Sequence, residues 1–248
     1  MLRAICFDLW DTLIADPPGR GAVRAADRVR RVQRALRAGG WPASPAAITD
    51  AIQAALDSLT VIHNQNRDVD AAERVALLYR HLDPTLRPAQ DLPAPTQRAV
   101  SDAILGGVER VQPNLLPGAP ELLVDLRRRG LRLALVSNAG LSPGAVLRRT
   151  LRRFAIDRHF AVQLYSDETG AWKPHARMFA QALTALAVTP EETAFVGDTP
   201  ETDILGAQAC GLRWTALVGA ASVDGVRPDL HLRGVGELFP ALSARGLL

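Results

Sequence analysis

Residues 121–138 read ELLVDLRRRGLRLALVSN, a helical pattern that ends at a glycine and leads straight into an apolar segment. Apolar residues in the first half recur at helical spacing, and Gly130 is the kind of residue that ends a helix. The second half, 131–138, is apolar except for Arg132 until it reaches Ser137, which is typical of a strand buried on both faces. This stretch therefore predicts one helix followed by one strand of a parallel sheet.

The same alternation of helix and strand continues to the C-terminus. Helical spacing recurs in later segments, and short apolar runs lie between them and at the start of the chain. The predicted helices are 143–154, 174–188, 200–211 and 235–248, and the predicted strands are 2–7, 161–166, 191–198, 213–219 and 228–234. Apolar strands separated by single helices require a parallel sheet with helices on both faces. The predicted fold class is therefore α/β, with a Rossmann-like doubly wound parallel sheet.

Residues 16–115 differ from the rest of the chain because they show helical spacing and no strand alternation. Helical segments separated by clusters of proline and glycine are predicted at 22–40, 45–65, 69–82 and 95–111. An all-helical domain inserted after the first strand is the simplest explanation. We therefore expect a core formed by 1–15 and 116–248, with the helical insert at 16–115.

The composition limits the class of protein. Of the 248 residues, 48% are hydrophobic and 22% are charged, which is globular and excludes extended disorder and coiled coil. No apolar run is long enough to cross a bilayer, so we expect a soluble, cytoplasmic protein without a membrane partner. The net charge is only +3 and acidic residues lie between the arginine clusters, which favours solvated helix faces over nucleic-acid binding.

Polar residues follow the predicted strands at the positions where ligands bind in such sheets, namely the carboxyl ends of the strands. These residues are Asp8, Ser137, Asn138, Lys173, Asp198 and Asp203. Carboxylates at two strand ends are suitable ligands for Mg²⁺, while a serine hydroxyl and a lysine can bind a phosphate. One carboxylate is then free to attack phosphorus. Lys173 is also the only lysine among 29 basic residues, which indicates a role that arginine cannot fill.

Each of these residues also has a purely structural explanation. Asp198 lies two residues before Pro200, where it would serve well as a helix N-cap. Ser137 and Asn138 together are typical of a turn. Because these residues occur together at the ends of successive strands, a purely structural explanation is weakened for the group as a whole, although not for Asp203 taken alone.

Four segments of the chain, in this order, resemble the four motifs of the haloacid dehalogenase superfamily of hydrolases. They are FDLWDTL at 7–13, LVSN at 135–138, WKP at 172–174 and VGDTPETD at 196–203. The insert at 16–115 is similar to the superfamily's helical cap of the first type. The resemblance implies a Mg²⁺-dependent phosphatase that acts on a small phosphorylated metabolite through an aspartyl-phosphate intermediate.

The resemblance also implies roles for the charged residues. Asp8 would be the nucleophile and a Mg²⁺ ligand, and Lys173 would neutralise Asp8 and the phosphate with its compact ammonium group. Asp198 would bind the metal, and Asp203 would either support the metal or orient Lys173.

Three uncharged residues complete the set that the resemblance implies. Ser137 would donate a hydrogen bond to the phosphoryl oxygens, and Asn138 is grouped with it as a substrate-binding residue. Thr12 would stabilise the loop after the first strand beside the substrate.

One position departs from the pattern of the superfamily's phosphatases, which usually carry a second aspartate two residues after the nucleophile. Here the sequence is Asp8-Leu9-Trp10, so the backbone carbonyl remains as a metal ligand but the general acid does not. Asp11 follows directly, yet a helical or an extended loop would turn it away from the site. We interpret Asp11 as a loop-capping carboxylate, with a role as the replacement acid as the alternative.

The same departure supplies two alternative functions. In the superfamily's L-2-haloacid dehalogenases, which need no metal, an aromatic residue occupies the position of Trp10. However, those enzymes lack the acidic fourth motif, and a metal-free site would gain nothing from Asp198, because it would repel Asp8. The missing acid is also compatible with a non-catalytic binding protein that keeps affinity for Mg²⁺ and phosphate. We favour the phosphatase because the fourth motif is intact.

Overall fold

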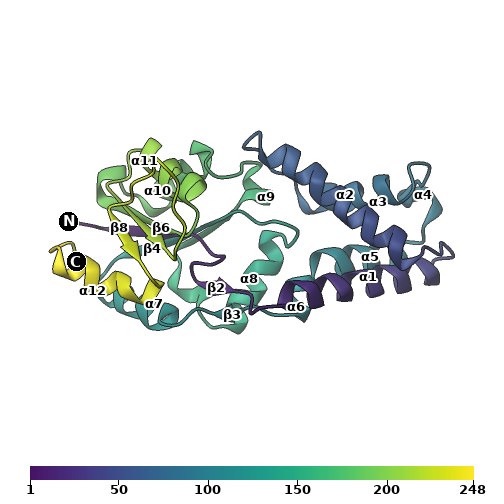
Figure 1. The fold of residues 1–248 in the computed structure, drawn as a ribbon, viewed down its shortest axis with the longest axis horizontal. Helices are drawn as coiled ribbons and strands as arrows, with labels where there is room; N and C mark the ends of the chain where they lie inside the picture. Colours follow the sequence, from purple (N-terminus) through teal and green to yellow (C-terminus); the bar gives the residue numbers. More distant parts are fainter.

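A computed structural model of the chain contains a six-stranded sheet at the end of the molecule that holds both termini (Figure 1). The structure describes residues 1–248 apart from the side chain of Ala89. All neighbouring strands are parallel, in the order β5-β4-β1-β6-β7-β8. Their bounds are β1 (Ala4–Phe7), β4 (Arg132–Ser137), β5 (Val162–Tyr165), β6 (Thr193–Gly197), β7 (Trp214–Val218) and β8 (Leu230–Leu232).

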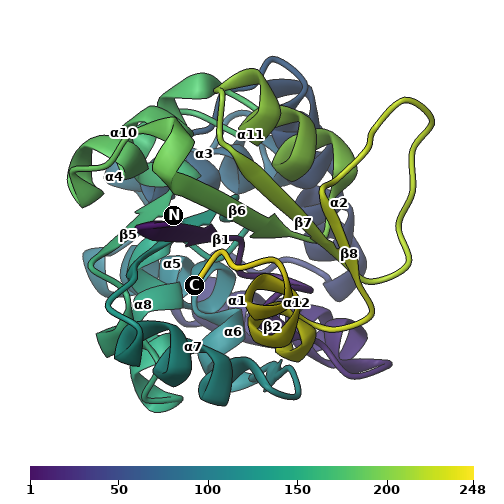
Figure 2. The same ribbon diagram turned by 90° about the vertical axis from the view of Figure 1, so that its left-hand side faces the viewer.

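Helices cover both faces of this sheet (Figure 2). One face carries α7 (Ala119–Arg128), α8 (Gly144–Arg153) and α12 (Leu238–Ala244), and the other carries α10 (Ala176–Leu186) and α11 (Leu205–Ala209). The central strand β1 supplies both layers, because Ile5 and Phe7 pack on the first face while Ala4 and Cys6 pack on the second. The predicted α/β class with a Rossmann-like doubly wound sheet is confirmed.

Several short elements join the strands and helices of the sheet. They are α9 (Ser166–Thr169), η1 (Asp157–His159), η2 (Pro190–Glu192), η3 (Pro200–Ile204) and η4 (Val235–Glu237). The segment 200–211, predicted as one helix, is instead a π-helical turn, η3, followed by α11. In this turn the N–H of Leu205 bonds to the carbonyl of Pro200, five residues back.

Residues 20–110 form a separate group of helices, here called the helical lobe, which extends away from the sheet (Figure 1). It comprises α1 (Arg20–Ala38), α2 (Pro45–His63), α3 (Ala71–Leu82), α4 (Pro88–Asp91), α5 (Ala94–Leu105) and α6 (Gly107–Arg110). The lobe has a hydrophobic core of its own, with Leu36, Ile48 and Val100 at its centre. Within the described part of the chain, no helix combines the length and apolar character needed to span a membrane.

The chain leaves the sheet for the helical lobe and returns from it at one place. There β2 (Ile14–Ala15) pairs antiparallel with β3 (Asn114–Leu115). Each of these strands has only two residues, so neither shows the alternation of apolar and polar residues that identifies a strand in a sequence. The pairing places both connections side by side, directly after the loop that follows β1.

Candidate active site

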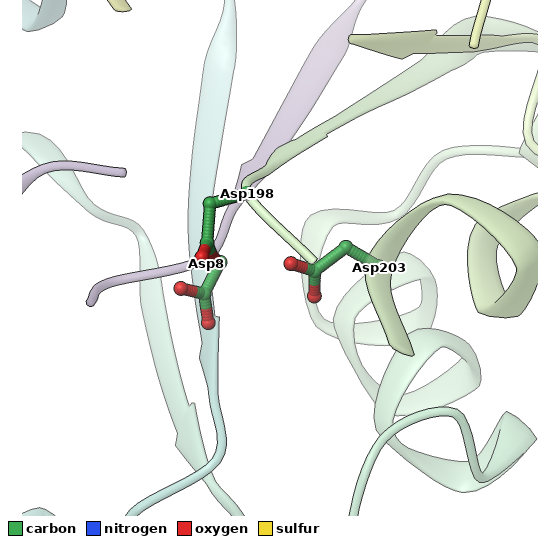
Figure 3. A group of neighbouring side chains, drawn as sticks. All are labelled: Asp8, Asp198 and Asp203. Atoms are coloured by element: carbon green, nitrogen blue, oxygen red, sulfur yellow. The ribbon is translucent and has the colours of Figure 1, made fainter. Parts of the chain in front are cut away.

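Three aspartates from distant parts of the sequence lie together at the carboxyl ends of neighbouring strands (Figure 3). Asp8 follows β1, Asp198 follows β6, and Asp203 lies in η3. One carboxylate oxygen of each lies within 4.8 Å of one from both of the others. With Lys173, described next, they form the site cluster. The structure thus brings together the charged residues predicted from the sequence.

Asp203 reaches this position because of the glycine that ends β6. A Cβ atom at Gly197 would overlap the carboxylate of Asp203, so only glycine lets the side chain lie against the strand end. The backbone N–H of Thr199 donates to Asp203 Oδ2 at 3.1 Å. Asp203 is only 1% exposed, and it is therefore fixed by its surroundings rather than free in the cavity.

Lys173 joins the two ends of the site cluster. Its Nζ donates to Asp8 Oδ1 at 2.6 Å and to Asp203 Oδ1 at 2.7 Å. The side chain is almost completely buried. Burial by itself lowers the pKa of Lys173, but the two carboxylates outweigh it and the net pKa is raised, so the ammonium keeps its charge.

The site cluster carries more negative than positive charge. Burial, together with Asp203 and Asp198, raises the pKa of Asp8 to about 7, although Lys173 opposes the change. Burial, Asp203 and Asp11 raise the pKa of Asp198 to about 6. Among the described residues, no hydrogen-bond donor reaches Asp8 Oδ2. The surplus of carboxylate over ammonium groups in the site cluster therefore favours an additional cation.

Asn138 and Ser137, predicted to bind substrate, lie at the end of β4 in different environments. Asn138 lines the cavity, and its Oδ1 accepts a 2.8 Å hydrogen bond from the backbone N–H of Lys173. Ser137 is fully buried, and its hydroxyl donates only a long 3.4 Å bond to the carbonyl of Asn138. Asn138 thus holds the backbone that carries Lys173, a role that the sequence did not suggest.

Thr12 differs from expectation. It is completely buried, and its hydroxyl has no hydrogen-bond partner among the described residues. No side-chain hydrogen bond through which Thr12 would stabilise the loop after β1 is therefore present among the described residues. Thr12 is not among the residues that line the cavity, and its neighbours Leu9, Leu13 and Ile14 pack into the core.

Asp11 also differs from expectation, because it lies at the cavity from which the loop was expected to turn it away. Its φ angle is +52°, a left-handed conformation that is neither the helical nor the extended loop on which the prediction rested. Asp11 lines the same cavity as Asp8, and its carboxylate forms no hydrogen bond with the described residues. Among the described residues, the carboxylate therefore caps no backbone N–H of the loop. Burial and the nearby Asp16 raise its pKa.

A cavity of about 330 Å³ opens above the site cluster. Its lining includes Asp8, Trp10, Asp11, Trp172, Lys173 and Asp198. The two indole rings are half-buried and form apolar walls beside the charged groups. The sequence indicates Trp10 as a metal ligand through its backbone carbonyl and as the residue that replaces an acid, and Trp172 as part of the motif that contains Lys173. Nothing in the sequence placed Trp172 in the wall.

A second group of buried polar residues, here called the interface cluster, joins the helical lobe to the sheet. It consists of His63, Asp68, Arg74, Ser166 and Asp167. Arg74 Nη2 donates to Asp68 Oδ2 at 2.7 Å, and the Ser166 hydroxyl donates to the same oxygen at 2.5 Å. His63 Nε2 lies 3.1 Å from Asp68 Oδ1. No sequence motif marks this cluster, and its members come from both parts of the chain.

Comparison with known proteins places the chain among related hydrolases. It is 38% identical over 135 residues to a phosphoserine phosphatase of Thermus thermophilus, covering 54% of this chain and 53% of that protein. The match thus spans only about half of that relative. A phosphoglycolate phosphatase of Escherichia coli O157:H7 is 27% identical over 257 residues, covering 98% of this chain and 93% of that protein.

Solved structures agree with the fold. A 2-haloacid dehalogenase from Pseudomonas syringae superposes with a TM-score of 0.73 at 23% identity, covering 99% of this chain and 100% of the other. At this identity the likeness concerns the fold alone. Residues 2–211 match the family described as haloacid dehalogenase-like hydrolase, which confirms the resemblance that the four motifs indicated. The chain therefore belongs to the haloacid dehalogenase-like hydrolase family.

Proposed function

We propose that this hydrolase is a Mg²⁺-dependent phosphatase that acts on a small phosphorylated metabolite. The observation that carries the proposal is the state of Asp8: Lys173 holds its Oδ1 at 2.6 Å, while its Oδ2 has no donor among the described residues. One oxygen is thus oriented and the other is available for attack. The phosphatase names of the two relatives described above support the same chemistry.

The donor set fits Mg²⁺, a hard cation that prefers oxygen ligands. Asp8, Asp198 and the backbone carbonyl of Trp10 would hold it, because Asp203 is already occupied by Lys173 and by the N–H of Thr199. The surplus of carboxylates over ammonium groups in the site cluster supplies the charge that a cation would balance. When bound, Mg²⁺ would neutralise the charge that develops on the phosphoryl oxygens.

The residues then act in sequence on the phosphate ester. Asp8 Oδ2 attacks phosphorus, the bond from phosphorus to the ester oxygen breaks, and an aspartyl phosphate forms. Asp11 donates a proton to the departing oxygen, a role supported by its place in the cavity wall and by the absence of a hydrogen bond from the described residues to its carboxylate. Water then attacks phosphorus and gives one proton to the Asp11 carboxylate, the bond from phosphorus to Asp8 Oδ2 breaks, and inorganic phosphate leaves with both Asp8 and Asp11 restored. Lys173 keeps Asp8 oriented and neutralises the transferred group throughout.

The division of the chain into two parts fits this proposal. Residues 1–15 and 116–248 would form the catalytic core, and 16–115 would form a cap over the cavity. The paired strands β2 and β3 lie at the two junctions and support a hinge there. Cap closure would exclude bulk water and help to select the substrate.

A dehalogenase would share Asp8 and an aromatic residue at the position of Trp10, but the site cluster disfavours it. Without a metal, Asp198 only adds negative charge beside the nucleophile. Burial is the main cause of the raised pKa of Asp8, and the charges of Asp203 and Asp198 raise it further. The phosphatase uses every charged group in the cluster, whereas the dehalogenase leaves Asp198 without a purpose.

Hydrolysis of p-nitrophenyl phosphate, measured with Mg²⁺ and then with excess EDTA, tests the proposal. Its leaving group needs little help from an acid. We expect turnover that requires the metal and that falls by on the order of 10⁶-fold in Asp8→Asn, the size typical for loss of a nucleophile. The matched control is Asp125→Asn, a substitution of a half-exposed aspartate on α7, which should leave turnover unchanged.

Other results would contradict the proposal in distinct ways. Halide release from 2-chloropropionate that EDTA does not affect would establish the dehalogenase instead. Binding of Mg²⁺ and inorganic phosphate without turnover of any ester would establish the non-catalytic binding protein.

A further inference from the structure

The two tryptophans that wall the cavity are each contacted by a cationic or titratable side chain of the helical lobe. The Arg24 guanidinium, from α1, lies 5.8 Å from the centre of the Trp10 ring. The His63 imidazole, from the end of α2, stacks on Trp172 with 3.5 Å between ring centres and 10° between planes. One surface of each indole is therefore occupied, and the half-buried remainder lines the cavity.

An aspartate fixes each of these contacting side chains in turn. Asp16 accepts two hydrogen bonds from Arg24, at 2.5 and 2.7 Å. Asp68 lies 3.1 Å from His63 Nε2 and is itself held by Arg74 at 2.7 Å. Because every partner is fixed by another, the two rings are held in place, and little conformational freedom remains to be lost when a ligand contacts them.

The backbone of the second tryptophan is also tied to the lobe. Trp172 N–H donates to the carbonyl of Asn66 at 3.1 Å, and Arg67 forms a bridge with Ala171. The next residue is Lys173, which holds Asp8. The position of this wall relative to the nucleophile is therefore set jointly by the lobe and by the core.

We infer that Trp10 and Trp172 determine specificity by selecting phosphate esters that carry a flat aromatic ring close to the phosphate, with His63 as a positioning residue for Trp172. The inference rests on the proposed phosphatase function. The charged end of the cavity takes the phosphate, and the fixed indole walls contact the ring, because aromatic rings prefer the offset-stacked or edge-to-face arrangements that such walls offer. A cavity of about 330 Å³ limits this selection to small esters.

Benzyl phosphate and cyclohexylmethyl phosphate test the inference with Mg²⁺ present. Both release a primary alcohol, so the demand for acid assistance is nearly the same, while only benzyl phosphate has a flat ring. We expect a KM for benzyl phosphate that is about fivefold lower, the size of a single aromatic contact, with kcat alike for the two esters.

Variants separate the aromatic contact from general stability. Trp172→Leu and Trp10→Leu should each shrink the KM difference, whereas Trp172→Phe should retain most of it. His63→Ala should weaken the preference through KM alone, and His63→Phe should restore it, because a phenyl ring can also stack on Trp172. The matched control is Trp41→Leu, a substitution of a tryptophan that packs against the core of the lobe, and it should leave the preference unchanged.

Inhibition by benzylphosphonate and cyclohexylmethylphosphonate distinguishes failure of this inference from failure of the proposed function. Stronger inhibition by benzylphosphonate, lost in Trp172→Leu, is the expected result. Equal inhibition and equal KM values would overturn the aromatic selection while leaving the phosphatase intact. Absence of hydrolysis of both esters and of p-nitrophenyl phosphate would overturn the proposed function, and the inference with it.

Discussion

The site cluster and the interface cluster are both groups of polar and charged side chains around a buried aspartate, but the two aspartates behave in opposite ways. Burial raises the pKa of Asp8 to about 7, and Lys173 opposes this change without cancelling it. Burial also acts to raise the pKa of Asp68, but there the hydrogen bond from His63 and the charge of Arg74 outweigh it and the net pKa is lowered. The carboxylate of Asp68 accepts four hydrogen bonds, whereas the carboxylate of Asp8 accepts only one from the described residues.

This difference separates a structural role from a chemical one. Asp68 has both carboxylate oxygens satisfied, so its charge is stabilised and unavailable for reaction. Asp8 has one oxygen oriented by Lys173 and the other left without a donor from the described residues. Both aspartates are buried, and their hydrogen-bond partners distinguish the oriented, reactive carboxylate from the fully bonded one.

Removal of the buried arginine should have the largest effect on stability. Arg74→Met would leave Asp68 and Asp167 buried beside an apolar chain, and we expect a loss of about 3–5 kcal/mol in the free energy of unfolding. Urea denaturation measures this loss. In the wild type, Arg74 Nε and Nη1 are buried without a hydrogen-bond partner among the described residues, which is itself destabilising. Removal of Arg74 also removes this cost and so offsets part of the expected loss.

The matched control is Arg80→Met on the same helix. Arg80 pairs with Glu73, but its side chain is 58% exposed, and exposed pairs of this kind contribute about 0–1 kcal/mol. If Arg74→Met changed the stability no more than the control, the interface cluster would not be a structural element.

Substitution of the candidate acid should have a smaller, substrate-dependent effect. Asp11→Asn should lower kcat/KM about 10²-fold for alkyl phosphates and only a few-fold for p-nitrophenyl phosphate, because the latter leaving group needs little protonation. A leaving-group series at constant pH measures the difference. An equal loss for all esters would show that Asp11 acts in another way, and no loss for any would assign the proton to water.

The pH dependence of stability should reveal the interface cluster separately. The pKa of Asp68 in the folded protein lies below its ordinary value of 3.8, so its contribution to stability is fully present above that value. The contribution is lost as the pH falls through the folded pKa. The difference in unfolding free energy between the wild type and Asp68→Asn should therefore stay constant from pH 7 to about 5 and narrow below that. A difference that grew on acidification would contradict the assignment.

The sequence predicted the sheet well because each strand is apolar along its length and each connection is a helix. It also predicted that Asp8, Asp198 and Lys173 would meet, since parallel strands align their carboxyl ends at one edge. These features depend on local patterns and on one topological rule.

Features that depend on single backbone angles or on distant packing could not be predicted in this way. Asp11 lines the cavity with a positive φ angle, and the next residue, Thr12, is completely buried. The stacking of His63 on Trp172 joins the helical lobe to the core. A contact between two residues so far apart in the sequence leaves no periodic pattern of apolar residues from which it could be predicted.

The most direct test of the difference between the two clusters is the effect of Mg²⁺ on thermal unfolding. If the site cluster lacks a balancing cation, saturating Mg²⁺ should raise the unfolding temperature of the wild type by about 5 °C relative to EDTA. Asp198→Asn should lose this shift, whereas Asp68→Asn, although less stable, should keep it. An unchanged unfolding temperature in the wild type, or an equal shift in Asp198→Asn, would contradict the account.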